Sequence, residues 1–453
     1  MTCSVISSAA WRRCVPESGC HARQSADGLP VTVSEVRHAR ALVEALFREA
    51  LQAVHGRRCV AQYLQAGART GETAVIAIGK AACAMMAGAV DVLQDAVRSG
   101  LTISAAGEAP VCQPADSRIR HVCGNHPVPA ADSLAAGQTL LEFLATRPAR
   151  DRLLFLISGG TSSLVEVPQA GIAPAELQAV NDWLLGSGLD IVQMNRVRCA
   201  LSQIKCGRLR RFLGARDARV LLLSDVPGDD AGVIGSGLLY PPSSGAVPLP
   251  SLPSLPDWLQ ALTDRVTAVE AFAGEIEHCI VGSNRVALDA IVAGARREGW
   301  QAMRMDEPLT GDVHQAAGRI VAQCQSAVPG LYVWGGETTV RLPEQPGEGG
   351  RNQQLALAVA DRLTPGLPVV LLSAGTDGRD GNSDAAGAII DAQTVTRGRQ
   401  CGLDPGDTLR RAAAGTFLAA SGDRLVTGPT GTNVMDIVIA VKLAETADEA
   451  RPV

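Results

Sequence analysis

Short apolar segments alternate with glycine-containing turns and helical patterns along most of the chain. Each segment has the length of a buried strand, and polar residues gather directly after it. This repetition is typical of doubly wound α/β sheets, whose ligands bind at the carboxyl ends of the strands. The predicted strands are residues 73–78, 152–157, 218–223, 279–281, 332–334, 369–372 and 436–441.

Length and composition are those of a protein with large apolar cores. The chain has 453 residues, which suggests two or three domains at roughly 150 residues each. Hydrophobic residues make up 46% but aromatic residues only 3%, so we expect cores of Ala, Val, Leu and Ile. The longest apolar runs, such as residues 153–157, are too short to cross a bilayer, and we expect no membrane partner. A formal net charge of -5 argues against a nucleic-acid partner.

The 12 cysteines are scattered, and no C-x-x-C pair occurs. This spacing supports neither a zinc ribbon nor a thioredoxin-type motif. Several cysteines, such as Cys83 and Cys279, stand in apolar or small-residue runs and are interpreted as small core hydrophobes. We therefore expect a reducing compartment and a cytoplasmic protein.

Residues 1–33 differ from the rest of the chain. They contain Ser and Arg12-Arg13 but no continuous apolar region, so a secretory signal is not predicted. We expect a disordered extension; an organelle-transit segment is the alternative, and Glu17 and Asp27 count against it. A helix is predicted from about residue 34, with Ser34 as N-cap, and the Pro- and Ser-rich residues 241–257 indicate a long loop or linker.

Lysine is rare in this chain. Of 41 basic residues only Lys80, Lys205 and Lys442 are lysines. A position that keeps lysine suggests a need for a compact ammonium that a planar guanidinium cannot replace. Gly79-Lys80 lies at a predicted strand-to-helix turn, where backbone N–H groups and the helix dipole favour an anion. The alternative is a surface lysine on a first helical turn.

Several common site motifs are absent from the sequence. There is no G-x-x-x-x-G-K-[ST] loop, because Ala81 follows Gly79-Lys80 and Ala74 stands where the first glycine would be. No G-x-G-x-x-G fingerprint follows a predicted strand, so a standard dinucleotide site is not supported. The lack of H-E-x-x-H and G-x-S-x-G excludes the common zinc peptidase and α/β-hydrolase interpretations.

Two groups of aspartates follow predicted strands. Carboxylates beside flexible turns are the ligands that Mg²⁺ requires, and phosphoryl transfer needs both that cation and a carboxylate near the acceptor hydroxyl. Asx-turn chemistry explains any single aspartate equally well, but it explains the two groups together less well. The groups are Asp225, Asp229 and Asp230, and Asp377, Asp380 and Asp384.

Further polar residues are candidates for anion binding. Arg351 follows a glycine pair before a helical run and could grip a carboxylate or phosphate with two hydrogen bonds. His126 lies in a Pro-flanked turn and either contacts substrate or makes a structural hydrogen bond. Residues 195–205 form a basic stretch in which Arg198 and Lys205 are predicted to share one helical face, as a solvated face or the wall of an anion site.

These motifs, in this order, resemble the class II glycerate kinases, which carry a C-terminal MOFRL domain and have often been labelled hydroxypyruvate reductases. The resemblance runs from about residue 34 to residue 443. It implies a Rossmann-like domain over residues 34–275 and a smaller α/β MOFRL domain over residues 276–450, with the active site between them. The matching segments are residues 77–82, 124–129, 158–160, 224–229, 335–340, 350–353, 376–378 and 384–387.

The resemblance also implies transfer of the ATP γ-phosphoryl group to the C2 hydroxyl of D-glycerate, with Mg²⁺ as cofactor. Lys80, Asp225 and Arg351 would be the catalytic residues. Asp225 would orient or deprotonate the hydroxyl, or hold Mg²⁺; its place in the motif leaves these roles open. Metal ligands would be Asp225, Asp229 and Asp377. Substrate or nucleotide contacts would come from Gly79, Ser158, Gly159, Gly160, Asn195, Lys205, Ser283, Asn284, Glu337 and Thr376.

The sequence departs from the pattern of this family in one region. It has Arg198-Cys199-Ala200 where a basic residue and His are expected, and Lys205-Cys206-Gly207 where Lys-Gly-Gly is expected. The side chain of Cys206 would narrow the space in which a ligand can approach the backbone. This departure therefore bears on which substrate is bound more than on which type of reaction is catalysed. The alternatives are an NAD(P)H-dependent hydroxypyruvate reductase and a kinase of another small hydroxy acid. We expect a monomer or a homodimer.

Overall fold

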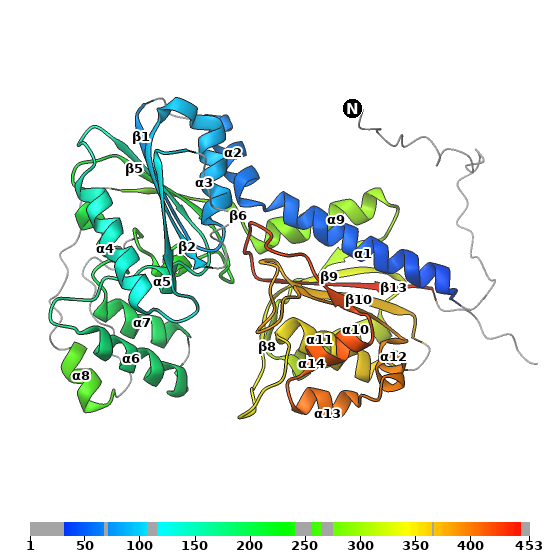
Figure 1. The fold of residues 1–453 in the computed structure, drawn as a ribbon. Helices are drawn as coiled ribbons and strands as arrows, with labels where there is room; N and C mark the ends of the chain where they lie inside the picture. The colour runs from blue at the N-terminus through cyan, green and yellow to red at the C-terminus, as the bar shows by residue number, and fades with distance from the viewer. Residues whose placement is uncertain are drawn as a thin grey trace, which may run out of the picture.

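The computed structural model describes residues 31–67, 71–106, 116–189, 191–240, 255–263, 275–364 and 367–444. Two α/β domains lie side by side, and helix α1 (Val33–Ala53, blue) extends along the second of them (Figure 1). Nearly all of the predicted N-terminal extension and most of the predicted linker fall outside the described residues.

The first domain is built on a parallel sheet of six strands in the order β3-β2-β1-β4-β5-β6. This order confirms the predicted Rossmann-like, doubly wound domain. From β1 the chain adds β2 and β3 on one side, and it then crosses back to add β4, β5 and β6 on the other side of β1. The switch point therefore lies between β1 and β4. The strands are β1 (Thr73–Ile78), β2 (Val97–Ala105), β3 (Ile119–Gly124), β4 (Arg152–Ile157), β5 (Ala218–Leu223) and β6 (Glu277–Gly282).

Helices cover both faces of this sheet, and for this reason its strands are almost wholly apolar. All six residues of β1 are buried. Val75 packs in the cluster that contains Met85 of α3, whereas Ile76 packs with Leu140 of α4 on the other face. The helices are α2 (Gly56–Gly67), α3 (Ala82–Leu93), α4 (Ala131–Ala145), α5 (Thr161–Leu164), α6 (Pro174–Gly186), α7 (Ile191–Leu201) and α8 (Asp257–Thr263), with 3-10 turns η2 (Gln94–Ala96), η4 (Arg208–Phe212) and η5 (Ile234–Ser236).

The second domain contains a seven-stranded sheet in the order β12-β11-β10-β13-β9-β7, with β8 beside β9. Most of its neighbouring strands are antiparallel; β7 and β8 are parallel to β9. The second domain is therefore the predicted smaller α/β domain with a mixed sheet: β10 leads through a turn into antiparallel β11, and no helix intervenes. The strands are β7 (Ala302–Arg304), β8 (Leu309–Asp312), β9 (Gly330–Thr339), β10 (Val369–Gly375), β11 (Gly387–Asp391), β12 (Arg424–Leu425) and β13 (Asp436–Lys442).

Helices also cover the second sheet. Leu355 and Val359 of α11 pack with Leu371 of β10 in one apolar cluster. On the opposite face, α1 packs against β10 and β13, and α9 packs against β9, β7 and β13. The helices of this domain are α9 (Asn284–Arg297), α10 (Val313–Ser326), α11 (Arg351–Arg362), α12 (Thr394–Gln400), α13 (Pro405–Arg410) and α14 (Ala414–Ala420).

The predicted domain limits, residues 34–275 and 276–450, divide the chain differently from the sheets. Strand β6, which follows residue 275, is the edge strand of the first sheet. Helix α1, which precedes the first sheet, packs on the second one. The described part of the chain therefore starts on the second domain, forms the first domain, and returns.

Helix α1 has both local and long-range determinants. Its N-cap is Thr32 rather than the predicted Ser34: Thr32 and Glu35 form a reciprocal capping box. Arg40 then reaches the second domain, where it pairs with Asp391 at 2.6 Å and with Asp423 at 2.9 Å. Arg397 binds the same two carboxylates at 3.0 and 2.6 Å, so two cations and two anions hold the helix on the sheet.

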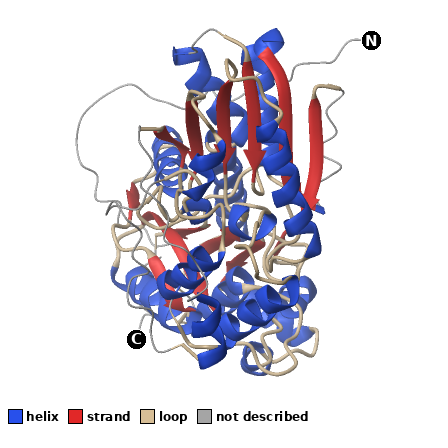
Figure 2. Ribbon diagram, turned by 90° about the vertical axis from the view of Figure 1, so that its left-hand side faces the viewer, coloured by secondary structure: helices blue, strands red, loops and turns tan. Residues whose placement is uncertain are grey.

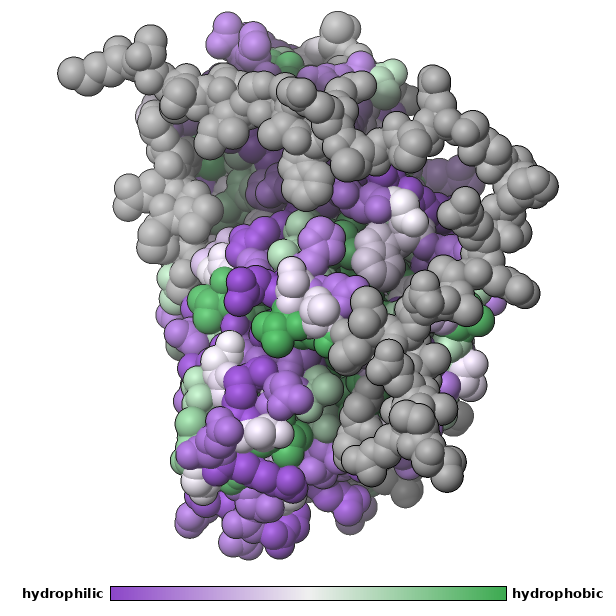
Figure 3. Space-filling model, turned by 90° about the vertical axis from the view of Figure 1, so that its right-hand side faces the viewer, coloured by the Kyte–Doolittle hydropathy of each residue, from purple (hydrophilic) through white to green (hydrophobic). Residues whose placement is uncertain are grey.

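Within the described ranges, every helix is too short or too polar to span a bilayer. Figure 3 shows one face of the molecule, on which the uncovered described surface is mostly hydrophilic and hydrophobic residues occur in small groups. This is the usual pattern of a surface that faces water.

We expect Arg40→Ala to lower the free energy of unfolding by about 2 kcal/mol, because two buried carboxylates lose a charged hydrogen-bond donor. Arg48→Ala is the matched control: Arg48 lies on the same helix and pairs with exposed Glu44. Its loss should change stability by about 0.5 kcal/mol or less. Urea unfolding measures both variants, and equal effects would refute the structural role of Arg40.

Candidate active site

The predicted phosphate-handling residues gather at the carboxyl edge of the first sheet. Lys80 follows β1, Gly159 follows β4 and Asp225 follows β5. Because β1 and β4 flank the switch point, their two turns lie next to each other there. Figure 2 shows the loops at these strand ends between the two domains.

Lys80 is held between the turns after β1 and β4. Its N–H donates to the carbonyl of Gly159 at 2.9 Å. Its Nζ donates to Asp377 Oδ2 of the second domain at 2.7 Å, and both side chains are largely buried, with 23% and 20% exposed. A Cβ at position 79 would collide with Ser158, and Gly79 has φ 127°, so glycine is required there. Lys80 thus connects the two domains.

Asp225 lies beside this pair. Asn433 of the second domain donates from Nδ2 to Asp225 Oδ2 at 3.2 Å. A Cβ at position 159 would collide with both of these side chains, which explains why Gly159 is a glycine. Burial raises the pKa of Asp225 to about 6, and the charge of Lys80 works in the opposite direction. The carboxyl group therefore titrates close to neutral pH.

Arg351 begins α11 and is fixed by two carboxylates. Its Nε donates to Asp436 Oδ2 at 2.6 Å, and a second nitrogen reaches Asp436 Oδ1 at 3.0 Å. A third nitrogen pairs with Glu337 at 2.8 Å. Burial opposes the guanidinium charge, but Asp436 and Glu337 together hold the pKa of Arg351 above its ordinary value. With 37% of its side chain exposed, Arg351 also remains accessible to a ligand.

Electrostatics link Arg351 to the Lys80 group. Burial raises the pKa of Glu337, Arg351 and Lys80 lower it, and Asp225 raises it further. Lys80 and Asp225 thus lie close enough to Glu337 for their charges to act on it. The three predicted catalytic residues and predicted Glu337 and Asp377 therefore form one charged cluster between the domains.

His126 stands at the edge of this cluster. A Cβ at Gly160 would lie 3.1 Å from the His126 ring and 3.3 Å from the Lys80 side chain. Burial and the charge of Lys80 lower the pKa of His126 to about 4. The imidazole is therefore neutral at pH 7 and adds no charge to the cluster.

Three predicted site residues support the cluster instead of lining it. Asn284 donates to the carbonyls of Val434 and Asp436 at 2.8 and 3.0 Å. The Thr376 hydroxyl donates to the Met435 carbonyl at 2.6 Å and accepts from the Val434 N–H at 2.8 Å. Both hold residues 433–436. Ser283 is the N-cap of α9.

The predicted metal ligands Asp225, Asp229 and Asp377 do not all lie together in the structure, and the metal site stays a prediction. Among the described residues, no three His, Cys, Asp or Glu side chains come together as a metal site. Asp225 and Asp377 both face Lys80, but Asp229 does not join them. Asp380, also proposed from the sequence, is buried and accepts the Asn352 and Gln353 N–H groups at 3.0 and 2.8 Å at the start of α11.

Lys205 was predicted to bind substrate or nucleotide, but it lies inside the first domain. Its Nζ donates to Glu166 Oε2 at 2.6 Å, and the two side chains are only 1% and 3% exposed. Ser202 donates to the other Glu166 oxygen at 2.6 Å. Helix α7 ends at Leu201, so Arg198 and Lys205 do not share a helical face, and that prediction is wrong.

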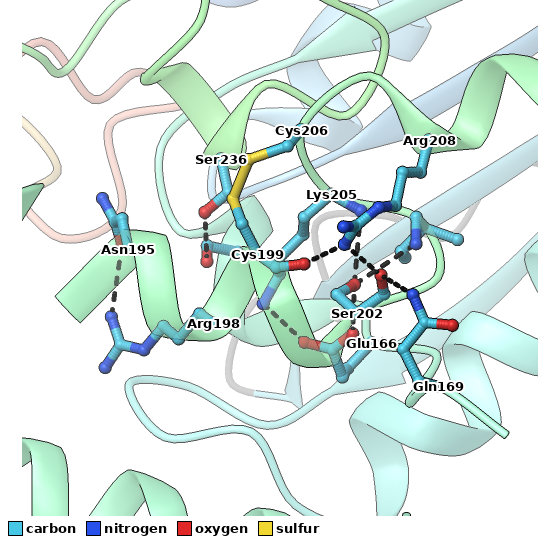
Figure 4. The surroundings of a disulfide bond; sticks show 12 residues. Glu166, Gln169, Asn195, Arg198, Cys199, Ser202, Lys205, Cys206, Arg208 and Ser236 are labelled. Atoms are coloured by element: carbon cyan, nitrogen blue, oxygen red, sulfur yellow. Dashed lines mark hydrogen bonds and ion pairs between the residues drawn. A yellow bond between two sulfur atoms is a disulfide. The ribbon is translucent and has the colours of Figure 1, made fainter. Parts of the chain in front are cut away.

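Asn195 and Arg198 do lie on α7. Figure 4 shows their side chains pointing away from the Lys205–Glu166 pair. Arg198 donates to Asn195 Oδ1 at 3.5 Å, and the buried Nε of Arg198 has no hydrogen-bond partner among the described residues. Asn195 therefore stays a predicted contact that the charged cluster does not include.

Asn433 and Asp436 were not predicted as site residues. Asp436 was predicted only as the first residue of the last strand. The signal was present: residues 428–433 contain Gly, Thr and Asn directly before a buried strand. Because β13 runs antiparallel to β10, its start lies beside the end of β10, where Asp377 follows.

The chain is similar to known proteins over most of its length. The MOFRL family model matches residues 330–436, and a domain of unknown function (DUF4147) matches residues 42–249. A D-glycerate 2-kinase of Thermotoga maritima is 35% identical over 81% of this chain and 90% of its own length. A glycerate 2-kinase of Pyrococcus horikoshii is 33% identical over 82% and 87%. A protein of Agrobacterium vitis with a provisional hydroxypyruvate reductase name is 35% identical over 81% and 98%.

A crystal structure of the Thermotoga maritima glycerate kinase superimposes with a TM-score of 0.78 and 30% identity, over 90% of this chain and 100% of that one. The fold and the charged cluster place the chain among two-domain α/β phosphotransferases. Given the extent of these matches, the chain belongs to the glycerate kinase family.

We expect Lys205→Met to lower the free energy of unfolding by about 3–5 kcal/mol, because it leaves Glu166 charged and buried without its partner. The double variant Lys205→Met/Glu166→Leu should recover part of that loss. Chemical denaturation measures both. If Lys205→Met left stability unchanged but raised KM for a substrate, Lys205 would be a binding residue, as the sequence predicted.

Proposed function

We propose that this chain transfers the γ-phosphoryl group of ATP to the C2 hydroxyl of D-glycerate. The observation that carries the proposal is the Lys80–Asp377 pair at 2.7 Å, which sets an ammonium beside Asp225 between the two domains. Membership of the glycerate kinase family supports the same reaction. Two carboxylates and two cations around one point suit a reaction in which negative charge moves between oxygens.

Each charged residue has a distinct task in this proposal. Lys80 neutralises charge on the phosphoryl group as it passes to the acceptor. Asp225 accepts the proton of the C2 hydroxyl; its pKa of about 6 leaves it ionised but still basic at neutral pH. Arg351, held in place by Asp436, grips the carboxylate of glycerate with two hydrogen bonds.

Among the described residues, no three His, Cys, Asp or Glu side chains form a complete Mg²⁺ site. Mg²⁺ usually binds through one or two carboxylates together with substrate phosphates and water. Asp377 fits that role for an ion that arrives with the nucleotide, and Asp225 stays free to accept the hydroxyl proton. When bound, the ion would neutralise negative charge on the phosphate groups of the nucleotide.

The position of phosphorylation has a direct test. Purified protein is incubated with ATP and D-glycerate, and the product is passed to enolase without phosphoglycerate mutase. We expect immediate formation of phosphoenolpyruvate, because enolase uses only the 2-phosphate. Phosphoenolpyruvate formed only after mutase is added would assign the C3 hydroxyl. Oxidation of NADH by hydroxypyruvate without ATP-dependent turnover of glycerate would favour the reductase instead.

We expect Asp225→Asn to lower kcat by a factor of about 10²–10⁴, because the amide cannot accept the hydroxyl proton. Asp384→Asn is the matched control: Asp384 belongs to the second aspartate group of the sequence, but its side chain is 80% exposed. That variant should keep the wild-type kcat. Steady-state ADP release measures both, and an active Asp225→Asn enzyme would exclude Asp225 as the base.

A further inference from the structure

Cys199 and Cys206 form a disulfide with a Cα–Cα distance of 5.8 Å (Figure 4). The sequence analysis did not foresee this pair. Cys199 lies in the last turn of α7, and Cys206 follows the helix after a short loop. Both cysteines stand where the sequence departs from the pattern of its family, which has a basic residue at the first position and glycine at the second. The two departures are therefore one structural feature.

Cys206 has a backbone conformation that favours glycine. Its φ is 52°, in the left-handed region, and φ of Gly207 is 78°. A residue with a Cβ is strained there unless its surroundings hold it. Two things hold Cys206: the bond to Cys199, and a pair of backbone hydrogen bonds from residues 206 and 207 to the carbonyls of Ser236 and Gly237, at 2.9 and 2.6 Å.

A series of hydrogen bonds leads from this turn to the charged cluster. The Ser236 hydroxyl lies 2.7 Å from the Ser162 hydroxyl in α5. The neighbouring Thr161 donates to the carbonyl of Ile78 at 2.9 Å. Ile78 is followed by Gly79 and Lys80. The backbone at Cys206 is thus linked through η5 and α5 to the residue that carries the predicted catalytic ammonium.

The loop closed by the disulfide also contains buried charges. Lys205 and Ser202 bind Glu166, and Arg208 donates to the carbonyls of Cys199 and Ser202. These groups stay satisfied only while the loop keeps its shape. Any relaxation at Cys206 therefore moves a charged, tightly bonded segment.

We propose that Cys199–Cys206 is a reversible thiol–disulfide site that sets the substrate affinity of the kinase, an inference that rests on the proposed function. Cys206 is partly exposed and Cys199 only 7% exposed, so a small thiol attacks at Cys206. The protein–thiol mixed disulfide forms and Cys199 leaves as thiolate. A second small thiol then releases Cys206, giving two protein thiols and one small-molecule disulfide. Oxidised glutathione reverses both steps.

Reduction removes one of the two restraints on Cys206. Its backbone then relaxes out of the left-handed region and loosens the hydrogen bonds to Ser236 and Gly237. We expect reduction with dithiothreitol to raise KM for D-glycerate about fivefold. This factor is at the low end of the usual energetic coupling between two sites of one protein. Treatment with oxidised glutathione should restore the original value. Thiol counting by alkylation of the unfolded protein confirms the state of the pair in each sample.

Two variants separate the disulfide from the backbone strain. Cys206→Ser keeps a Cβ and removes the bond, so it should show the KM of the reduced enzyme with or without dithiothreitol. Cys206→Gly also removes the bond but tolerates φ 52°, so it should keep the KM of the oxidised enzyme in both conditions. Cys83 is also disulfide-bonded and is retained, so the response of Cys206→Gly to dithiothreitol measures the effect of the other disulfide. A response as large as that of the wild type would contradict the proposal.

Equal KM values for oxidised and reduced enzyme, or for the two variants, would overturn the proposal. So would a wild-type protein in which both thiols react under air. Failure of the proposed function would look different: ATP-dependent turnover would be absent in every state. The strain at Cys206 would still be testable then, because Cys206→Gly should melt about 2 °C or more above Cys206→Ser. Equal melting temperatures would refute it.

Discussion

The ion pair between Lys80 and Asp377 is the contact on which the arrangement of the site depends. It joins the end of β1 to the end of β10 at 2.7 Å, across the boundary between two independently formed sheets. Before substrate binds, Asp377 compensates the charge of a partly buried ammonium. An incoming phosphate must compete with that carboxylate. A divalent ion that binds Asp377 would free Lys80 for the phosphate, which gives a physical reason for nucleotide and metal to bind together.

One short segment of the second domain positions site residues of both domains. Residues 433–436 carry Asn433, which reaches Asp225, and Asp436, which fixes Arg351. Asn284 and Thr376 hold the backbone of this segment. The segment therefore sets the positions of the proposed base and of the proposed carboxylate-binding arginine relative to each other. A shift of the second domain would move both.

The sequence predicted what depends on neighbouring residues and missed what depends on distant ones. The strands of the first sheet, the turn at Lys80 and the aspartates at strand ends follow from local patterns. The antiparallel pairing of β13 with β9 and β10 does not, and with it the roles of Asn433 and Asp436 were missed. The disulfide was not predicted because a sequence separation of 7 between two cysteines indicates a bond only once α7 is known to end at Leu201.

The three lysines show how far the rarity of a residue type can be interpreted. Lys80 pairs with Asp377 between the domains, as its scarcity suggested. Lys205 is buried against Glu166, and Lys442 is buried with its Nζ donating to the carbonyls of Gln325 and Ala327. Each position accommodates a small ammonium on a thin stem, and a planar guanidinium would need more room. Lys205 and Lys442 are thus buried in structural contacts, and only Lys80 belongs to the charged cluster of the proposed chemistry.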